Sequence, residues 1–200
     1  MPVTTQTHLP LAVKRRTSSW AEISPCGTYR YNLGRQWNPE RPMFGLVMLN
    51  PSTADAESDD ATIIRVEDFG ERWEYGGFEA ANLYGLRSTD PRAIRTHPDP
   101  VGPDNDAHLT SLSHTYDLII LAWGANAEPV RAAHVTRLLA QGCATAGGSL
   151  AVLQWTKSGQ PHHPLRLPKT TVPQCLTPAS CALSPDGTTD ERWAQLMNAA

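Results

Sequence analysis

Polar and aromatic side chains that could do chemistry follow several apolar segments of the sequence. They are Asn50, Ser52, Asp55, Asn82, Tyr84, Trp123 and His163. Amides and hydroxyls orient a substrate through hydrogen bonds, while carboxylates and imidazoles move protons or stabilise charge. Their common position, directly after apolar segments, is a more specific signal than any single short motif among them.

Each of these residues also has an ordinary structural explanation. Asn50 begins an Asn-Pro-Ser turn, in which the amide can bond its own backbone. Asp55, Asp59 and Asp60 suit the start of a helix, where the helix dipole favours acidic side chains. His163 and the histidine before it suit an exposed loop. The sequence alone leaves both explanations open.

Known motifs exclude several reaction classes. The chain has no G-x-x-x-x-G-K-[ST] phosphate loop, no G-x-G-x-x-G after a strand and no G-x-S-x-G elbow. P-loop nucleotide hydrolysis, Rossmann redox chemistry and serine hydrolase chemistry are therefore disfavoured. The four cysteines form neither a C-x-x-C pair nor a zinc spacing, and the histidines lack a metal-ligand spacing. We expect reduced thiols, no metal and no cofactor.

Composition limits the partners. Seventeen basic and 20 acidic residues give a net charge of -3, whereas a protein that holds nucleic acid by bulk charge is normally basic. Any nucleic-acid contact must therefore be compact. No segment approaches the roughly 18 apolar residues of a membrane span, and the N-terminus lacks a signal-peptide pattern. We expect a cytoplasmic monomer that does not bind membranes.

The scaffold follows from alternating strand and helix patterns. Apolar runs without alternation are typical of strands buried on both faces, and they lie at 43–49, 78–84, 118–123 and 150–153. Helical spacing separates them, at 60–75, 104–114 and 130–139. This order predicts a three-layer α/β/α fold with a central, mostly parallel four-stranded sheet. Ligands of such sheets bind beyond the carboxyl ends of the strands, where the polar residues fall.

The chain divides into three regions. Residues 1–25 are polar and pattern-poor and indicate a flexible N-terminal arm. Residues 26–170 contain the predicted α/β domain, and 171–200 read as an irregular C-terminal extension.

Several motifs resemble a bacterial and phage family that is known only as a domain of unknown function. The likeness covers most of residues 25–168. Its motifs are R-Y-x-L-G-R-x-W at 30–37, M-L-N-P-S-T-A-D at 48–55, D-D-x-T at 59–62, N-L-Y at 82–84, A-W-G at 122–124 and T-K-S-G-Q-P-x-H-P-L at 156–165.

A more distant likeness is to the uracil-DNA glycosylase superfamily. Leu49–Ser52 is similar to the G-[IL]-N-P-G loop of its mismatch-specific branch, and Asn82 matches an Asn that ends the next strand in several branches. Residues 118–127 are similar to its strand, glycine loop and helix, and His163–Leu165 to its H-P-S loop. The chain departs from these motifs at the glycines of the first loop and the serine of the last. An amide at position 50, where the fastest uracil enzymes have Asp, argues against uracil as substrate.

The resemblance implies a uracil-DNA-glycosylase-like fold and hydrolysis of the N-glycosidic bond of a damaged or modified base, in DNA repair or phage-related DNA modification. Asn50, Asp55 and His163 would then be catalytic: the amide orients water, a carboxylate supplies negative charge and the imidazole donates to the base. Base-binding residues would be Ser52, Asn82, Tyr84 and Trp123. Nucleic-acid contacts would come from Lys157, Leu165, Arg166 and Lys169, with Leu165 as a wedge in the base stack.

Two other functions stay open. A module that binds a base without cleaving it would keep the same pocket. An enzyme that acts on a free nucleoside or nucleotide would fit the acidic net charge better, and the choice among DNA, RNA and a free nucleotide is not made by the sequence.

Overall fold

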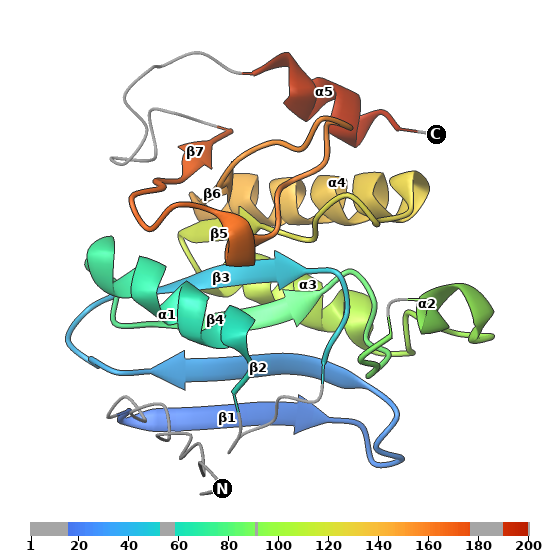
Figure 1. Ribbon diagram of the computed structural model, residues 1–200, viewed down its shortest axis with the longest axis horizontal. Coiled ribbons are helices and arrows are strands. Elements are labelled where there is room, and N and C mark those ends of the chain that lie inside the picture. Colours follow the sequence, from blue (N-terminus) through green and yellow to red (C-terminus); the bar gives the residue numbers. More distant parts are fainter. Residues whose placement is uncertain (1–15, 53–58, 91, 177–189, 200) are drawn as a thin grey trace, which may run out of the picture.

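A mixed seven-stranded sheet forms the centre of the protein (Figure 1). The computed structural model describes residues 16–52, 59–90, 92–176 and 190–199. Within them the strand order is β1-β2-β4-β3-β5-β6-β7. The strands are β1 (Ser18–Ile23), β2 (Arg30–Gln36), β3 (Met43–Met48), β4 (Gly77–Asn82), β5 (Leu118–Leu121), β6 (Ser149–Val152) and β7 (Gln174–Cys175).

Four neighbouring strands of this sheet run parallel. β3 pairs in parallel with β4 and β5, and β5 pairs in parallel with β6. The other three pairings, β1 with β2, β2 with β4 and β6 with β7, are antiparallel. The sheet thus has seven strands rather than the four expected. The added strands cover the backbone groups that β4 and β6 would otherwise expose as edges.

Some residues assigned to irregular regions are ordered. Ser18–Ile23, within the arm expected at 1–25, forms β1. Gln174–Cys175 and Glu191–Met197, within the extension expected at 171–200, form β7 and helix α5. Cys175 is disulfide-bonded, whereas Cys26 and Cys143 are free, which corrects the expectation of four reduced thiols.

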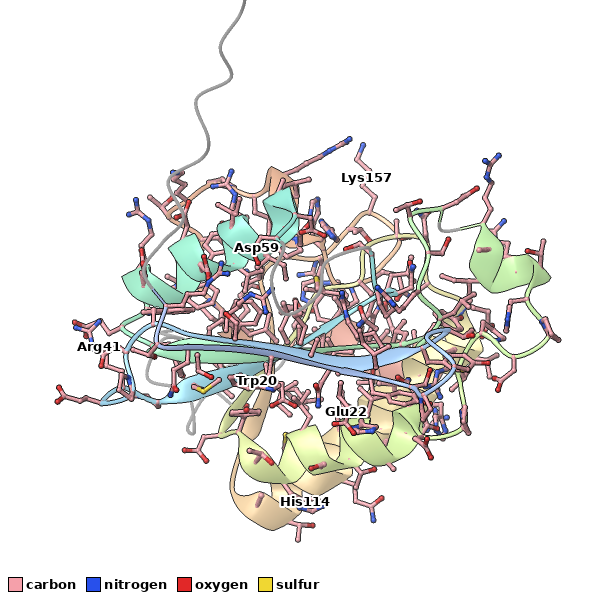
Figure 2. All side chains as sticks on the ribbon, turned by 90° about the horizontal axis from the view of Figure 1, so that it is seen from below. Trp20, Glu22, Arg41, Asp59, His114 and Lys157 are labelled. Carbon is pink, nitrogen blue, oxygen red and sulfur yellow. The ribbon has the colours of Figure 1, made fainter. Side chains whose placement is uncertain are left out.

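Helices cover both faces of the sheet. Besides α5 they are α1 (Ala61–Arg72), α2 (Ala93–Thr96), α3 (Asn105–Thr115), α4 (Pro129–Ala146) and the 3₁₀ helix η1 (Pro164–Arg166). Figure 2 shows α1 on one face and α3 with α4 on the other. Among the described residues, no helix combines the length and the hydrophobicity that crossing a bilayer requires.

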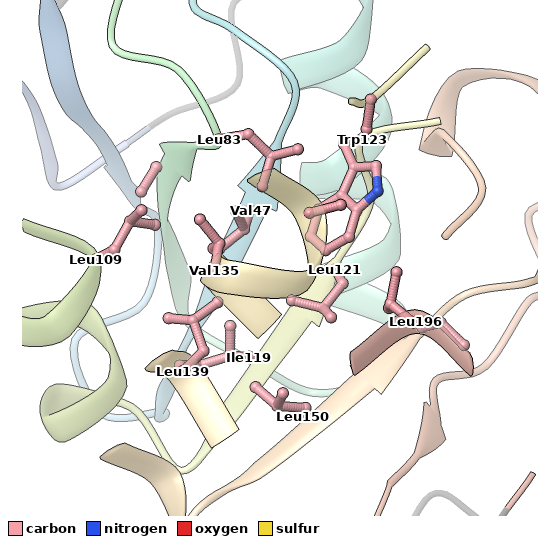
Figure 3. Close-up of a cluster of buried hydrophobic side chains, with 14 of the residues drawn as sticks. Val47, Leu83, Leu109, Ile119, Leu121, Trp123, Val135, Leu139, Leu150 and Leu196 are labelled. Atoms are coloured by element: carbon pink, nitrogen blue, oxygen red, sulfur yellow. The ribbon is translucent and has the colours of Figure 1, made fainter. Parts of the chain in front are cut away.

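The core has two halves because successive residues of a strand point to opposite faces. Phe44, Leu46 and Met48 of β3 pack on the α1 side. Val47 of β3 packs on the other side, in a cluster with residues of α3, α4 and α5 that Figure 3 shows in close-up. Burial on both faces explains why these strands lack an alternating pattern.

Because the four central strands are parallel, the loops that follow them meet at one edge of the sheet. Figure 1 shows α2 beyond the arrowheads of β3 and β4 at this edge. The loops after β3, β4, β5 and β6 carry nearly all of the residues that the sequence singles out.

Candidate functional site

A cavity of about 550 Å³ opens at the carboxyl edge of the sheet, on the side that α1 covers. Its walls come from the loops after β3 and β5, the first turn of α1 and the segment that leads into η1. Six residues predicted for the site line it: Asn50, Ser52, Trp123, His163, Leu165 and Arg166. Segments far apart in the sequence therefore form one cavity, as their position after parallel strands predicts.

Asn50 is held by the neighbouring loop. Its Nδ2 donates to the carbonyl oxygens of Pro51 at 3.1 Å and Ser88 at 2.8 Å. No described residue donates to its Oδ1, so this oxygen is left to accept a bond from a water or a ligand. The amide is thus both the turn residue and a fixed acceptor on the cavity wall.

Among the described residues, Asp60 is the carboxylate that reaches the cavity. It is the N-cap of α1: its Oδ1 accepts from the backbone N–H groups of Thr62 at 2.8 Å and Ile63 at 3.0 Å. Its Oδ2 accepts from the hydroxyl of Ser52 at 2.7 Å. Asp60 therefore both caps the helix, as an acidic residue at a helix start is expected to do, and lines the cavity. Asp55, which was predicted to be catalytic, lies outside the described residues.

Asp59 has a different environment. Its Oδ1 lies 2.9 Å from Nη2 of Arg35, a side chain that is fully buried, and Arg16 also pairs with this carboxylate. Arg16 pairs in turn with buried Glu67 at 2.5 Å. Asp59 thus compensates a buried charge and does not line the cavity.

We expect Asp59→Asn to lower the free energy of unfolding by about 3 kcal/mol, because it removes a carboxylate that pairs with the buried guanidinium of Arg35 and with Arg16. Urea denaturation followed by circular dichroism measures the change. Asp68→Asn, which removes a carboxylate that lies 3.4 Å from the exposed ammonium of Lys169, is the matched control and should cost under about 1 kcal/mol. Equal losses for the two variants would contradict a special role for the Arg35 contact.

His163 is poised as a neutral hydrogen-bond donor. Burial lowers the pKa of its imidazole below the ordinary 6.5, against the opposing charge of Asp60. Its Nδ1 accepts from the backbone N–H of Leu165 at 3.4 Å, which leaves the proton on Nε2. The ring of His162 instead donates from Nδ1 to the carbonyl oxygen of His163 at 2.9 Å. Nε2 of His163 thus keeps an N–H without a partner among the described residues, whereas the Nδ1–H of His162 is engaged within the loop.

Asn82, predicted to bind the base, is not among the residues that line the cavity. It is 0% exposed, and neither Oδ1 nor Nδ2 has a hydrogen-bond partner within the part of the chain that the structure describes. Asn82 pairs in register with Met48, which lines the cavity. Side chains alternate along a strand, so Asn82, two positions after Ala80, lies on the same face of the sheet as Ala80 and Met48, the face that α1 covers. A buried amide without partners costs about 1–3 kcal/mol, so a ligand that supplied them would bind favourably.

Neither of the two aromatic residues predicted to bind a base is exposed at this cavity. Trp123 borders it, but its side chain is 2% exposed, packs in the cluster of Figure 3 and donates from Nε1 to Gln160 at 2.8 Å. Tyr84 lines a second, neighbouring cavity. Trp123 and Tyr84 leave the strand ends on the α3 and α4 side of the sheet, whereas the first cavity is on the α1 side.

The cationic rim is small. Leu165, 40% exposed, and Arg166 stand at the cavity wall. Lys157 lies in the turn after β6 and points away from the body of the protein (Figure 2). Lys169 lies 3.4 Å from Asp68 of α1 and does not line the cavity. Of the predicted nucleic-acid contacts, Leu165 and Arg166 are thus at the site.

Arg30 is a cavity residue that the sequence-based prediction missed. It is 1% exposed at the start of β2, and its place as the first residue of the R-Y-x-L-G-R-x-W motif was the available signal. In the described ranges, no three His, Cys, Asp or Glu side chains are grouped so as to hold a metal ion.

Comparison with known proteins identifies one relationship. A family model described as a protein of unknown function, DUF1643, matches residues 30–165 of the chain. The match spans more than half of the chain and includes every cavity residue named above except Arg166. No curated protein and no solved structure matches the chain.

Proposed function

We propose that this chain, which belongs to the DUF1643 family, recognises a nucleobase and hydrolyses the N-glycosidic bond of a damaged or modified base in DNA. One observation carries the proposal: a fixed acceptor, a carboxylate and a neutral imidazole line a single cavity, beside a strand end whose buried amide has no hydrogen-bond partner among the described residues. These groups are Asn50, Asp60, His163 and Asn82.

The chemistry of the bond matches this set. In the transition state the sugar becomes positive, like an oxocarbenium ion, while the departing base becomes negative. The Oδ1 of Asn50 orients a water whose oxygen bonds to the sugar carbon as the bond to the base breaks. Asp60 stabilises the positive sugar and accepts the proton that the water loses. His163 donates from Nε2 to the base, which takes the electron pair and then a proton from solvent.

Base recognition falls to Asn82. Its amide presents one acceptor atom and one donor group, and a base edge with an adjacent N–H and C=O complements both. Asn105 keeps the end of β4 in place, because its Nδ2 donates to the carbonyl oxygens of Asn82 at 3.1 Å and Leu83 at 3.2 Å.

The architecture is compatible with a glycosylase-like fold. Four neighbouring parallel strands between α1 on one face and α3 with α4 on the other agree with what the resemblance to the uracil-DNA glycosylase superfamily implies. The antiparallel strands β1, β2 and β7 are additions at the two edges of this arrangement.

The decisive experiment combines activity with stability. DNAs that carry different modified bases, phage DNAs included, are incubated with the protein, and abasic sites are counted. We expect Asn82→Ala to reduce base release at least tenfold, because hydrogen bonds to the base are lost. Its free energy of unfolding should not fall, because the removed atoms have no hydrogen-bond partners among the residues that the structure describes.

Asn105→Ala is the matched control. This amide is equally buried but donates to two carbonyls, so its removal should cost about 1–3 kcal/mol of unfolding free energy. Full activity of Asn82→Ala, or a stability loss as large as that of Asn105→Ala, would contradict the assignment. If the protein binds bases but produces no abasic sites, it is a binding module that has lost catalysis.

A second candidate function is hydrolysis of a free nucleoside or nucleotide. The specific observation in its favour is the sparse cationic rim, because Lys169 pairs with Asp68 and the chain carries a net charge of -3. Salt distinguishes the two candidates: DNA binding weakens steeply with salt concentration, whereas binding of a small nucleotide weakens much less.

A further inference from the structure

A second cavity, of about 660 Å³, lies next to the first at the carboxyl edge of the sheet. Its wall is formed by residues after β4, by α2 and by the start of α4. Asn126, in the loop between β5 and α4, lines both cavities. The two cavities are therefore neighbours on either side of this one loop.

The lining of the second cavity is suited to a base and its phosphate. Ile94, Pro100 and Tyr84, a ring packed in the core cluster with 6% of the residue exposed, provide an apolar and aromatic wall. Arg95 is exposed beside them and has no ion-pair partner among the residues that the structure describes. Aromatic side chains bind the faces of nucleobases, and a free guanidinium binds phosphate.

The other charged groups of this cavity are engaged elsewhere. Both carboxyl oxygens of Glu128 accept from the first backbone N–H groups of α4, from Val130 at 3.0 Å and Arg131 at 2.8 Å. Arg92 is paired with Asp90 at 2.8 Å. Arg95 is thus the uncompensated cation at this mouth, in a chain whose net charge is negative.

We propose that the second cavity binds the nucleotide next to the one whose base enters the first cavity. The neighbouring base would lie against Tyr84, and a phosphate of the same strand would meet Arg95. The substrate is then a nucleic-acid strand and not a free nucleoside. This inference rests on the proposed function, because it takes the first cavity as the site of the reacting base.

The test compares short and longer ligands. Calorimetry measures the binding of the four deoxynucleoside 5′-monophosphates and of the four single-stranded homotetranucleotides at one salt concentration. The tetranucleotide of the best-bound base should bind at least about tenfold more tightly than its monophosphate. Arg95→Glu should remove this gain, leave the affinity for the monophosphate unchanged and lower the salt slope of tetranucleotide binding by about one.

Arg41→Glu is the control with the same charge change. Arg41 is exposed just before β3, at the opposite end of the parallel strands, and Figure 2 shows it at the periphery. Arg41→Glu should leave the tenfold gain in affinity of the tetranucleotide over the monophosphate intact. Tyr84→Leu provides a second test, because it removes the ring without changing charge and should also reduce the gain.

The outcomes separate the inference from the proposed function. Equal affinities for monophosphate and tetranucleotide, or equal effects of Arg95→Glu and Arg41→Glu, would overturn the second subsite while the first cavity kept its function. Loss of monophosphate binding in Arg95→Glu would also overturn it, because the arginine would then serve the first cavity. Failure of all eight ligands to bind would overturn the second subsite, and only the additional absence of abasic sites on every modified DNA would overturn the proposed function.

Discussion

Replacing His163 with alanine is expected to reduce the rate of base release by about 10²–10³-fold. A neutral donor aimed at a developing negative charge typically contributes about 3–4 kcal/mol to the transition state, which corresponds to that factor. The imidazole has this form because burial lowers its pKa and the N–H of Leu165 occupies Nδ1. The ring belongs to a loop at the cavity and not to the core, so thermal unfolding should change little. Abasic-site counts on the active DNA measure the rate.

His162→Ala is the internal control. His162 also borders the cavity, but its Nδ1 is engaged with the carbonyl oxygen of His163. We expect its removal to be nearly silent apart from local packing. Equal effects of the two substitutions would indicate a paired-histidine metal site, which a chelator would then inactivate. No effect from either would remove the glycosylase interpretation of this loop and leave the nucleotide-binding alternative ahead.

The position of the site was predictable from local sequence patterns. Apolar runs that do not alternate indicate strands buried on both faces, and such strands in series indicate parallel pairing. The sequence alone therefore assigns Asn50, which follows β3, and His163, which follows β6, to the same edge of the sheet. The antiparallel strands β1 and β7 were not predictable in this way, because their pairing partners are set by contacts remote in the sequence.

Side-chain direction at the strand ends was harder to predict. Trp123 continues the alternation of Ile119 and Leu121, so its ring enters the core on the α4 side. Tyr84 follows the last residue of β4 by two positions, where the chain has already left the strand. A change of one position moves a side chain to the opposite face. A pattern of residue types does not show which face a side chain takes at the end of a strand. It therefore could not assign Trp123 and Tyr84 to one cavity or the other.

Position 50 holds an amide where the fastest uracil enzymes have Asp, and Asp60 supplies a carboxylate to the same cavity. The cap of α1 brings a carboxylate to the cavity wall that Asn50 also lines, and the hydroxyl of Ser52 orients it. An amide can orient water but cannot accept its proton. Asp60 can do so, and its negative charge also favours the positively charged sugar of the transition state.

Asp60→Asn should therefore reduce base release by about 10²–10⁴-fold, the range of a lost general base. Stability should change little, because asparagine caps a helix about as well as aspartate and its Oδ1 can keep the bonds from Thr62 and Ile63. Abasic-site counts and urea denaturation measure the two effects on the same preparation.

Comparison with Asp59→Asn makes this prediction specific, because the two aspartates are adjacent but have different contacts. Asp59 neutralises buried Arg35, so its loss should lower stability, whereas the surviving folded protein should keep its rate. Asp60 contacts the cavity and the helix cap, so its loss should lower the rate and keep stability. If Asp60→Asn retains full activity, the carboxylate is only a helix cap, and the negative charge must come from elsewhere. If both variants lose rate and stability together, the two residues form one structural unit and neither is catalytic.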